Sequence, residues 1–170
     1  DPAVLASDTQ LYLSIVGRLC SAEKLPFEFV TAAGDFLKTL QSIARDAGPH
    51  LDLAPALDAA RAFEAAADAL QQAPAGVTGA ACETLNRRLM QISRIINPVL
   101  YTMTGDHDQD PALQLPQLPA LQDARRLPHL DPASNDYGFL RTRLVRERNR
   151  VVDALQRATE AALQAAVVGA

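Results

Sequence analysis

The sequence predicts an all-α fold, an up-and-down helical bundle that ends in a long C-terminal helix preceded by a long, packed, proline-rich loop. Three observations support this prediction. The chain is 48% hydrophobic but only 5% aromatic, so its core depends on alanine and leucine, which rank highest in helix propensity. Its apolar residues recur at helical spacing. Residues 135–168 contain no proline. A chain of 170 residues fits a single domain.

The first four helices follow from their start and stop signals. Ser7 to Gln10 have the form of a capping box, which predicts a helix over residues 8–22. A second helix is expected between Pro26 and Gly48. The third, over residues 52–73, has a heptad seam of Ala56, Ala60, Phe63, Ala67 and Leu70. The fourth begins near residue 78, and Asn97-Pro98 is expected to stop it. Short turns between these helices predict antiparallel neighbours.

Residues 99–132 form the long loop. Prolines at 98, 111, 116, 119, 128 and 132 forbid a long helix there. Leucines recur throughout the same stretch, so we expect the loop to pack on the bundle surface. A short helix over residues 119–126 is predicted within it.

The last helix, over residues 135–168, has Ser134 and Asn135 as candidate caps. At about 100° per residue, its apolar stripe is wider than the seam of a two-helix contact. We therefore expect it to touch several surfaces, one of them on a second copy of the chain. Arg141 and Arg148 lie at the edge of the stripe, where their N–H groups suit a partner's carboxylate or carbonyl. The candidate residues of the dimer interface are Tyr137, Leu140, Arg141, Leu144, Arg148, Val151, Val152 and Leu155.

Charge and composition exclude several function classes. Sixteen basic and twenty acidic residues leave a net charge of -4, which disfavours nucleic acid as a partner. No apolar run reaches the ~18 residues that a membrane span needs. Cys20 and Cys82 lie at no metal-like spacing, and two buried thiols are favoured over a disulfide. Because the first residue is Asp1, we expect the chain to be a processed product or part of a longer one.

One acidic cluster is a weak metal candidate. Asp106, His107, Asp108 and Asp110 resemble the start of a calcium loop, but Pro111 and Gln117 occupy the positions where that motif needs glycine and glutamate. A solvated acidic turn is favoured. No motif of a nucleophile, general base or phosphate loop occurs, so we expect no catalytic or cofactor-binding residue in this domain. His50 and His129 are expected to be ordinary surface residues.

The order of several short motifs resembles the transferrin receptor-like dimerisation domain over nearly the whole chain. These motifs are Asp1-Pro2, Leu25-Pro26-Phe27, Asn86 to Leu89 leading to Asn97-Pro98, Leu118-Pro119-Ala120-Leu121, and the long last helix. The resemblance implies the C-terminal domain of a longer chain, which packs against a zinc-peptidase domain and forms a homodimer. It also implies that the zinc is bound in the peptidase domain and that the parent is extracytoplasmic or secreted.

Two functional hypotheses follow. In the family, glutamate carboxypeptidase II supplies a lysine-tyrosine pair to its substrate pocket from the loop before the last helix. Here residues 106–110 contain neither residue, and their acidity would repel a glutamate side chain. The first hypothesis is a homodimerisation domain of a glutamate carboxypeptidase-like zinc metallopeptidase, bordering its substrate site. The alternative is a free-standing helical module that binds a ligand or metal through the loop from Tyr101 to Asp110.

Overall fold

The computed structural model describes residues 1–73, 76–104, 109–110 and 114–168, and these ranges contain helices and no strand, which confirms the all-α prediction. The α-helices are α1 (Pro2–Ser21), α2 (Val30–Ala47), α3 (Ala54–Gln72), α4 (Gly79–Leu100) and α5 (Asn135–Val168). Two 3-10 segments, η1 (Gly48–His50) and η2 (Pro119–His129), complete the order.

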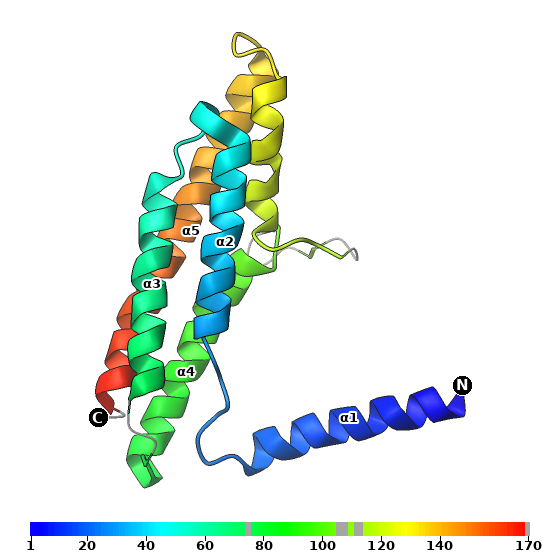
Figure 1. The fold of residues 1–170 in the computed structure, drawn as a ribbon, viewed down its shortest axis with the longest axis vertical. Helices are drawn as coiled ribbons and strands as arrows, with labels where there is room; N and C mark the ends of the chain where they lie inside the picture. The colour runs from blue at the N-terminus through cyan, green and yellow to red at the C-terminus, as the bar shows by residue number, and fades with distance from the viewer. Residues whose placement is uncertain (74–75, 105–108, 111–113, 169–170) are drawn as a thin grey trace.

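The bundle consists of α2, α3, α4, η2 and α5 (Figure 1). Helix α5 runs the length of the bundle, and α4 and η2 follow one another along it, so that together they take the place of one long helix. Helices α2 and α3 cover the remaining sides of the core. This arrangement explains why a helix of 34 residues is needed, since α5 must span both α4 and η2.

The core is built from small and branched apolar side chains, as the composition predicts. All five residues of the predicted heptad seam on α3 are buried. Phe36 of α2 and Phe63 of α3 meet edge to face, with ring centroids 6.4 Å apart. Each buried ring of this kind stabilises the fold by about 1.5–3 kcal/mol through burial of apolar surface.

The bounds of α5 are those predicted, and its start is capped as expected. The hydroxyl of Ser134 accepts a hydrogen bond from the backbone N–H of Tyr137 at 3.2 Å. Ser134 is in turn held by the preceding turn, because its own hydroxyl donates to the carbonyl of Asp131 at 2.7 Å. A serine in this role satisfies one of the orphan N–H groups at the helix start.

Helix α1 differs from the prediction in its start and in its place. It begins at Pro2, because the Asp1 carboxylate accepts from the N–H of Ala3 at 2.8 Å and proline suits the first helical position. The hydroxyl of Ser7, the expected cap, donates instead to the carbonyl of Ala3 at 3.0 Å. Helix α1 was expected to belong to the bundle, but it extends away from one end of the bundle (Figure 1). None of the residues of α1 is buried.

Two other helix ends also differ from the prediction. Helix α2 begins at Val30, where the carboxylate of Glu28 accepts from the N–H groups of Val30 and Thr31 at 2.6 and 3.1 Å. Helix α4 continues through Pro98 to Leu100. Pro98 removes one hydrogen bond of the helix, the one its N–H would donate to the carbonyl of Arg94. Burial of the next two residues, Val99 and Leu100, favours the last turn despite this loss.

The segment before α5 packs on the bundle, as its leucines predict. Leu118, Leu121 and Leu127 are buried. Arg125 of η2 donates to the Asp46 carboxylate at 2.6 Å and to the Ser42 hydroxyl at 3.2 Å, which fastens η2 to α2. The predicted short helix is thus present as η2, a 3-10 segment that extends three residues further than expected.

Candidate interaction surfaces

The candidate interface residues on α5 lie in three different environments. Leu144, Val151 and Leu155 are buried in the core of their own chain. Their apolar surface is therefore used inside the bundle and offers no area to a partner. The remaining candidates lie at the edge of the core or on the surface, and their contacts decide what α5 can still bind.

Three of these candidates are held by the turn between α2 and α3. The guanidinium groups of Arg141 and Arg148 donate to the backbone carbonyls of His50 and Asp52 at 3.3 and 3.0 Å. The Tyr137 hydroxyl lies 3.2 Å from Nδ1 of His50, and the two rings meet edge to face. The carbonyls expected on a partner thus belong to the same chain. His50, expected to be an ordinary surface residue, is half-buried and takes part in this contact.

One side of α5 keeps apolar surface beyond what the core covers. At about 100° per residue, Val145, Val152, Leu163 and Val167 fall within about 60° of one another, and we call these four residues the outer strip. Val145 and Val152 are half-buried, whereas Leu163 and Val167 are 50% and 77% exposed. The groove between α3 and α5 lies beside the strip and has a volume of about 440 Å³. Its lining residues are Ala59, Ala62, Gln156, Thr159 and Glu160.

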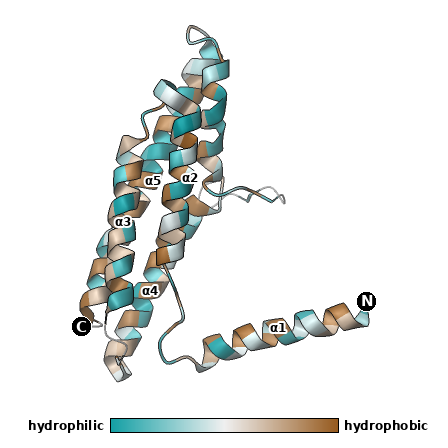
Figure 2. Ribbon diagram, in the orientation of Figure 1, coloured by the Kyte–Doolittle hydropathy of each residue, from teal (hydrophilic) through white to brown (hydrophobic). Residues whose placement is uncertain are grey.

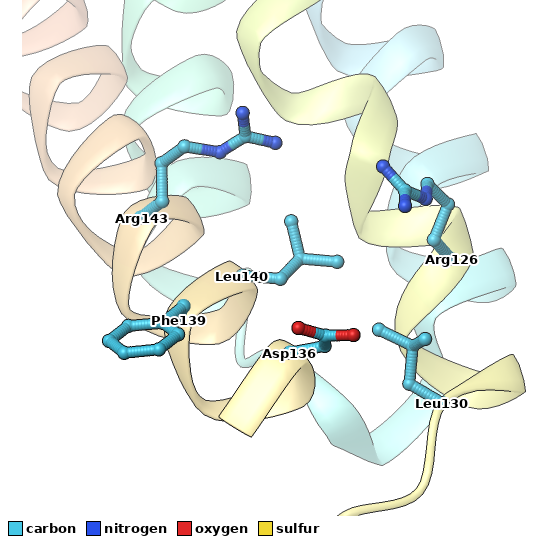
Figure 3. Close-up of a pocket in the computed structure, with 6 residues that line it drawn as sticks. All are labelled: Arg126, Leu130, Asp136, Phe139, Leu140 and Arg143. Atoms are coloured by element: carbon cyan, nitrogen blue, oxygen red, sulfur yellow. The ribbon is translucent and has the colours of Figure 1, made fainter. Parts of the chain in front are cut away.

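A second hollow of about 440 Å³ lies where η2 meets the start of α5 (Figure 3). Leu140, an interface candidate, and Leu130 point into it. Two arginines, Arg126 and Arg143, border it, and both are paired with the carboxylate of Asp123. Asp136, which also lines the hollow, supplies a second carboxylate, so two positive and two negative charges meet there and the hollow has no strong preference for an anion.

Beside this hollow, Phe139 is 75% exposed and points away from the other lining side chains (Figure 3). It lies on a different side of α5 from the outer strip, at about 100° per residue. The apolar surface of α5 is therefore divided between two separate places.

The base of the loop from Tyr101 to Asp110 is closed by a network of hydrogen bonds. The Asp110 carboxylate accepts from the N–H groups of Met103 and Thr104 at 2.9 and 3.0 Å and from the Thr104 hydroxyl at 2.9 Å. The N–H of Met103 contributes most to lowering the Asp110 pKa below its usual value. Arg150 of α5 donates to the carbonyls of Pro98 and Thr104 at 3.1 and 3.2 Å.

Of the weak metal candidates, only Asp110 lies in the part of the chain that the structure describes. Asp106, His107 and Asp108 lie outside the described residues. Among the described ranges, no group of three or more histidine, cysteine, aspartate or glutamate side chains gathers as a metal site would require. The Asp110 carboxylate serves the loop base instead.

The two cysteines have different environments. Both are free thiols, and Cys82 is buried, as expected, whereas Cys20 is exposed on α1. The Cys82 thiol donates to the carbonyl of Glu23 at 3.1 Å. His129, as expected, is exposed.

Among the described residues, most of the exposed large apolar side chains lie on α1, where the sequence suggested no site. Eight large apolar side chains of α1 are between 42% and 69% exposed: Val4, Leu5, Leu11, Tyr12, Leu13, Ile15, Val16 and Leu19. Figure 2 shows hydrophobic positions recurring along α1. The apolar periodicity from Leu11 to Leu19 marked this segment as a helix, but periodicity does not reveal which surface covers it. No described helix is both long enough and apolar enough to cross a membrane.

Comparison with known proteins gives no relative: no family model, no curated protein and no solved structure matches this chain. The class that the fold defines is a helical bundle with an external helix. Any assignment of function therefore depends on the surfaces described above.

Proposed function

We propose that this chain is the homodimerisation and assembly domain of a glutamate carboxypeptidase-like zinc metallopeptidase. In this role it packs against the peptidase domain, borders the substrate site and pairs with a second copy. The observation that carries the proposal is that α5 supplies the core on one side and keeps the outer strip of Val145, Val152, Leu163 and Val167 on another. The assignment of a zinc-peptidase parent is based on the order of motifs that resembles the transferrin receptor-like dimerisation domain.

The outer strip suits a contact between protein surfaces. The groove beside it contains the small residues Ala59 and Ala62 of α3, which let another helix approach closely. Polar Gln156 and Glu160 border the groove and provide the polar rim that protein interfaces have. The positions of Arg141 and Arg148 are fixed by bonds within the chain, so this surface needs little rearrangement to bind.

Sedimentation equilibrium at micromolar concentration tests the homodimer. Leu163→Asp places a charge in the strip and is expected to weaken dimerisation by about tenfold or more, or about 1.4 kcal/mol. Gln164→Asp adds the same charge at the next position, about 100° around the helix, and is the matched control. A wild-type chain that stays monomeric, or equal weakening by both variants, would contradict the homodimer.

A separate experiment tests the peptidase assignment. The longest natural polypeptide that contains this chain is expected to hydrolyse peptides, to lose that activity on treatment with a chelator and to regain it with zinc. This proposal assigns the zinc to the peptidase domain. A parent that neither binds zinc nor hydrolyses peptides would refute the peptidase assignment while leaving the dimerisation test intact.

A further inference from the structure

Helix α1 has the surface of a buried helix although it stands in the open. At about 100° per residue, its apolar side chains span an arc of about 200°. Much of the remaining circumference carries small residues: Ala3, Ala6, Ser7, Ser14, Gly17 and Ser21. An ordinary surface helix has a wide charged face, whereas α1 contains only two charged residues, Asp8 and Arg18. This distribution fits a helix enclosed on most sides.

Three hydroxyl groups of α1 already have hydrogen-bond acceptors within the helix. The hydroxyls of Ser7, Thr9 and Ser21 donate to the carbonyls of Ala3, Leu5 and Gly17, each four residues earlier, at 3.0, 2.7 and 2.6 Å. A buried hydroxyl is costly mainly when its donor has no partner. These three can be buried without that cost.

The segment that follows α1 is held against the bundle. The Asn86 amide donates to the Glu23 carbonyl at 2.7 Å, and its oxygen accepts from the N–H of Leu25 at 2.8 Å. Phe29 is buried in the core immediately before α2. Folding α1 back onto its own bundle would have to disturb these contacts, so its apolar arc needs another surface.

We propose that α1 inserts into an apolar groove on a separate folded protein domain, which supplies a basic group opposite Asp8. Asp8 lies within the apolar arc at about 100° per residue, and a carboxylate placed there requires a cation or N–H donors once it is buried. We identify that domain as the peptidase domain of the parent chain, and this identification rests on the proposed function. Helix α1 is then the surface through which the two domains meet.

Two other occupants fit α1 less well. A second α1 would cover a seam narrower than the 200° arc. In the described residues outside α1, the exposed large apolar side chains lie in several separate places, of which the outer strip holds only two: Phe27, Tyr101, Met103, Phe139, Leu163 and Val167. A membrane surface favours helices whose polar face is rich in lysine and arginine, whereas Arg18 is the single basic residue of α1.

Cys20 is a built-in probe of this contact, because it is exposed on α1 while Cys82 is buried. In the chain alone, N-ethylmaleimide is expected to modify Cys20 rapidly and Cys82 slowly. In the longest natural polypeptide that contains the chain, Cys20 is expected to react at about one tenth of this rate or more slowly still, because reaction then requires opening of the interface. Cys82→Ser leaves Cys20 as the reporting thiol of the two.

Matched variants test the role of Asp8. Asp8→Arg is expected to restore rapid modification of Cys20 in the long polypeptide, because arginine would face the basic group. Gln10→Arg, on the small-residue side of α1, adds one positive charge and is expected to restore much less of the Cys20 reactivity. Equal restoration by the two variants would overturn the assignment of a basic group.

Other outcomes would overturn the docking itself. These are unchanged Cys20 reactivity in the long polypeptide, concentration-dependent protection in the chain alone, or protection by vesicles of phosphatidylcholine and phosphatidylglycerol. The last two would assign α1 to a second copy or to a membrane. The proposed homodimer fails independently: a monomeric parent with a protected Cys20 refutes dimerisation alone, and a dimer with a reactive Cys20 refutes this docking alone.

Discussion

The side-chain amide of Asn86 donates to the backbone carbonyl of Glu23 at 2.7 Å and thereby joins the start of α4 to the segment that follows α1. The oxygen of the same side chain accepts a hydrogen bond from the N–H of Leu25 at 2.8 Å. An asparagine can satisfy a carbonyl and an N–H at once. One side chain therefore holds the segment that follows α1 against α4.

Replacing Asn86 by alanine is expected to release this segment without unfolding the bundle. Loss of two hydrogen bonds should lower the free energy of local opening by about 1–2 kcal/mol. Amide hydrogen exchange at Leu25 should then be roughly tenfold faster. Asn97→Ala, at an exposed position of α4 where the side chain donates to the Ser93 hydroxyl at 3.1 Å, is the control. Unchanged exchange at Leu25 in Asn86→Ala would contradict the positioning role.

Leu144→Ala is expected to destabilise the chain strongly, because Leu144 is fully buried in the core. Truncation of a buried leucine costs about 2–5 kcal/mol. Leu163→Ala, on the outer strip of the same helix, should cost about 1 kcal/mol or less, because that side chain is half exposed. Urea denaturation of both variants measures the difference. Similar losses for the two would show that Leu144 is less well packed than its burial indicates.

Arg150→Met is expected to loosen the base of the loop. The arginine donates to the carbonyls of Pro98 and Thr104, and its loss should destabilise the chain by about 1–2 kcal/mol. Arg157→Met removes an exposed ion pair with Asp153 and should change stability by about 0.5 kcal/mol or less. Thermal unfolding of the two variants checks this order, and an equal effect would contradict the role of Arg150.

The closure of the loop base is expected to depend on pH through Asp110. Hydrogen bonds, chiefly from the N–H of Met103, lower the pKa of Asp110 in the folded chain. A lowered pKa means that the stabilisation is present above the unfolded pKa and is lost as the pH falls through the folded value. Amide shifts of Met103 and Thr104 should follow this titration in NMR spectra.

Asp110→Asn should remove this titration from the two amides. Asp58→Asn, an exposed residue of α3 paired with Arg61, should leave the titration unchanged. If both amides of the unaltered chain kept constant shifts from neutral pH down to the acid limit of the fold, the closure by Asp110 would be disproved.

The sequence alone gave a good account of the long helix and its neighbours. The bounds of α5 and the buried seam of α3 follow from proline-free stretches and from apolar spacing, which are local properties. Caps were harder to assign. Ser134 was identified correctly. Asp1 was missed because Ser7 offered a competing capping signal, and Glu28 was missed because Pro26 offered a competing start signal.

The candidate interface was only partly predictable. Helical periodicity placed Leu144 and Val152 in one broad stripe, but it does not say how far the neighbouring helices cover that stripe. In the structure Leu144 is in the core and Val152 at its edge. Arg141 and Arg148 were expected to donate to a partner and instead donate to carbonyls of their own chain. Such contacts join residues about 90 positions apart, and spacing along the chain cannot reveal them.

The sequence by itself determined the all-α class and the approximate places of the helices, because helix propensity, proline positions and apolar period act over one or two turns. The tertiary structure alone decided which helices share a core. It placed α1 outside the bundle and let η2 continue the path of α4 along α5. Burial depends on side chains distant in sequence, such as Phe36 and Phe63, whose meeting no local pattern encodes.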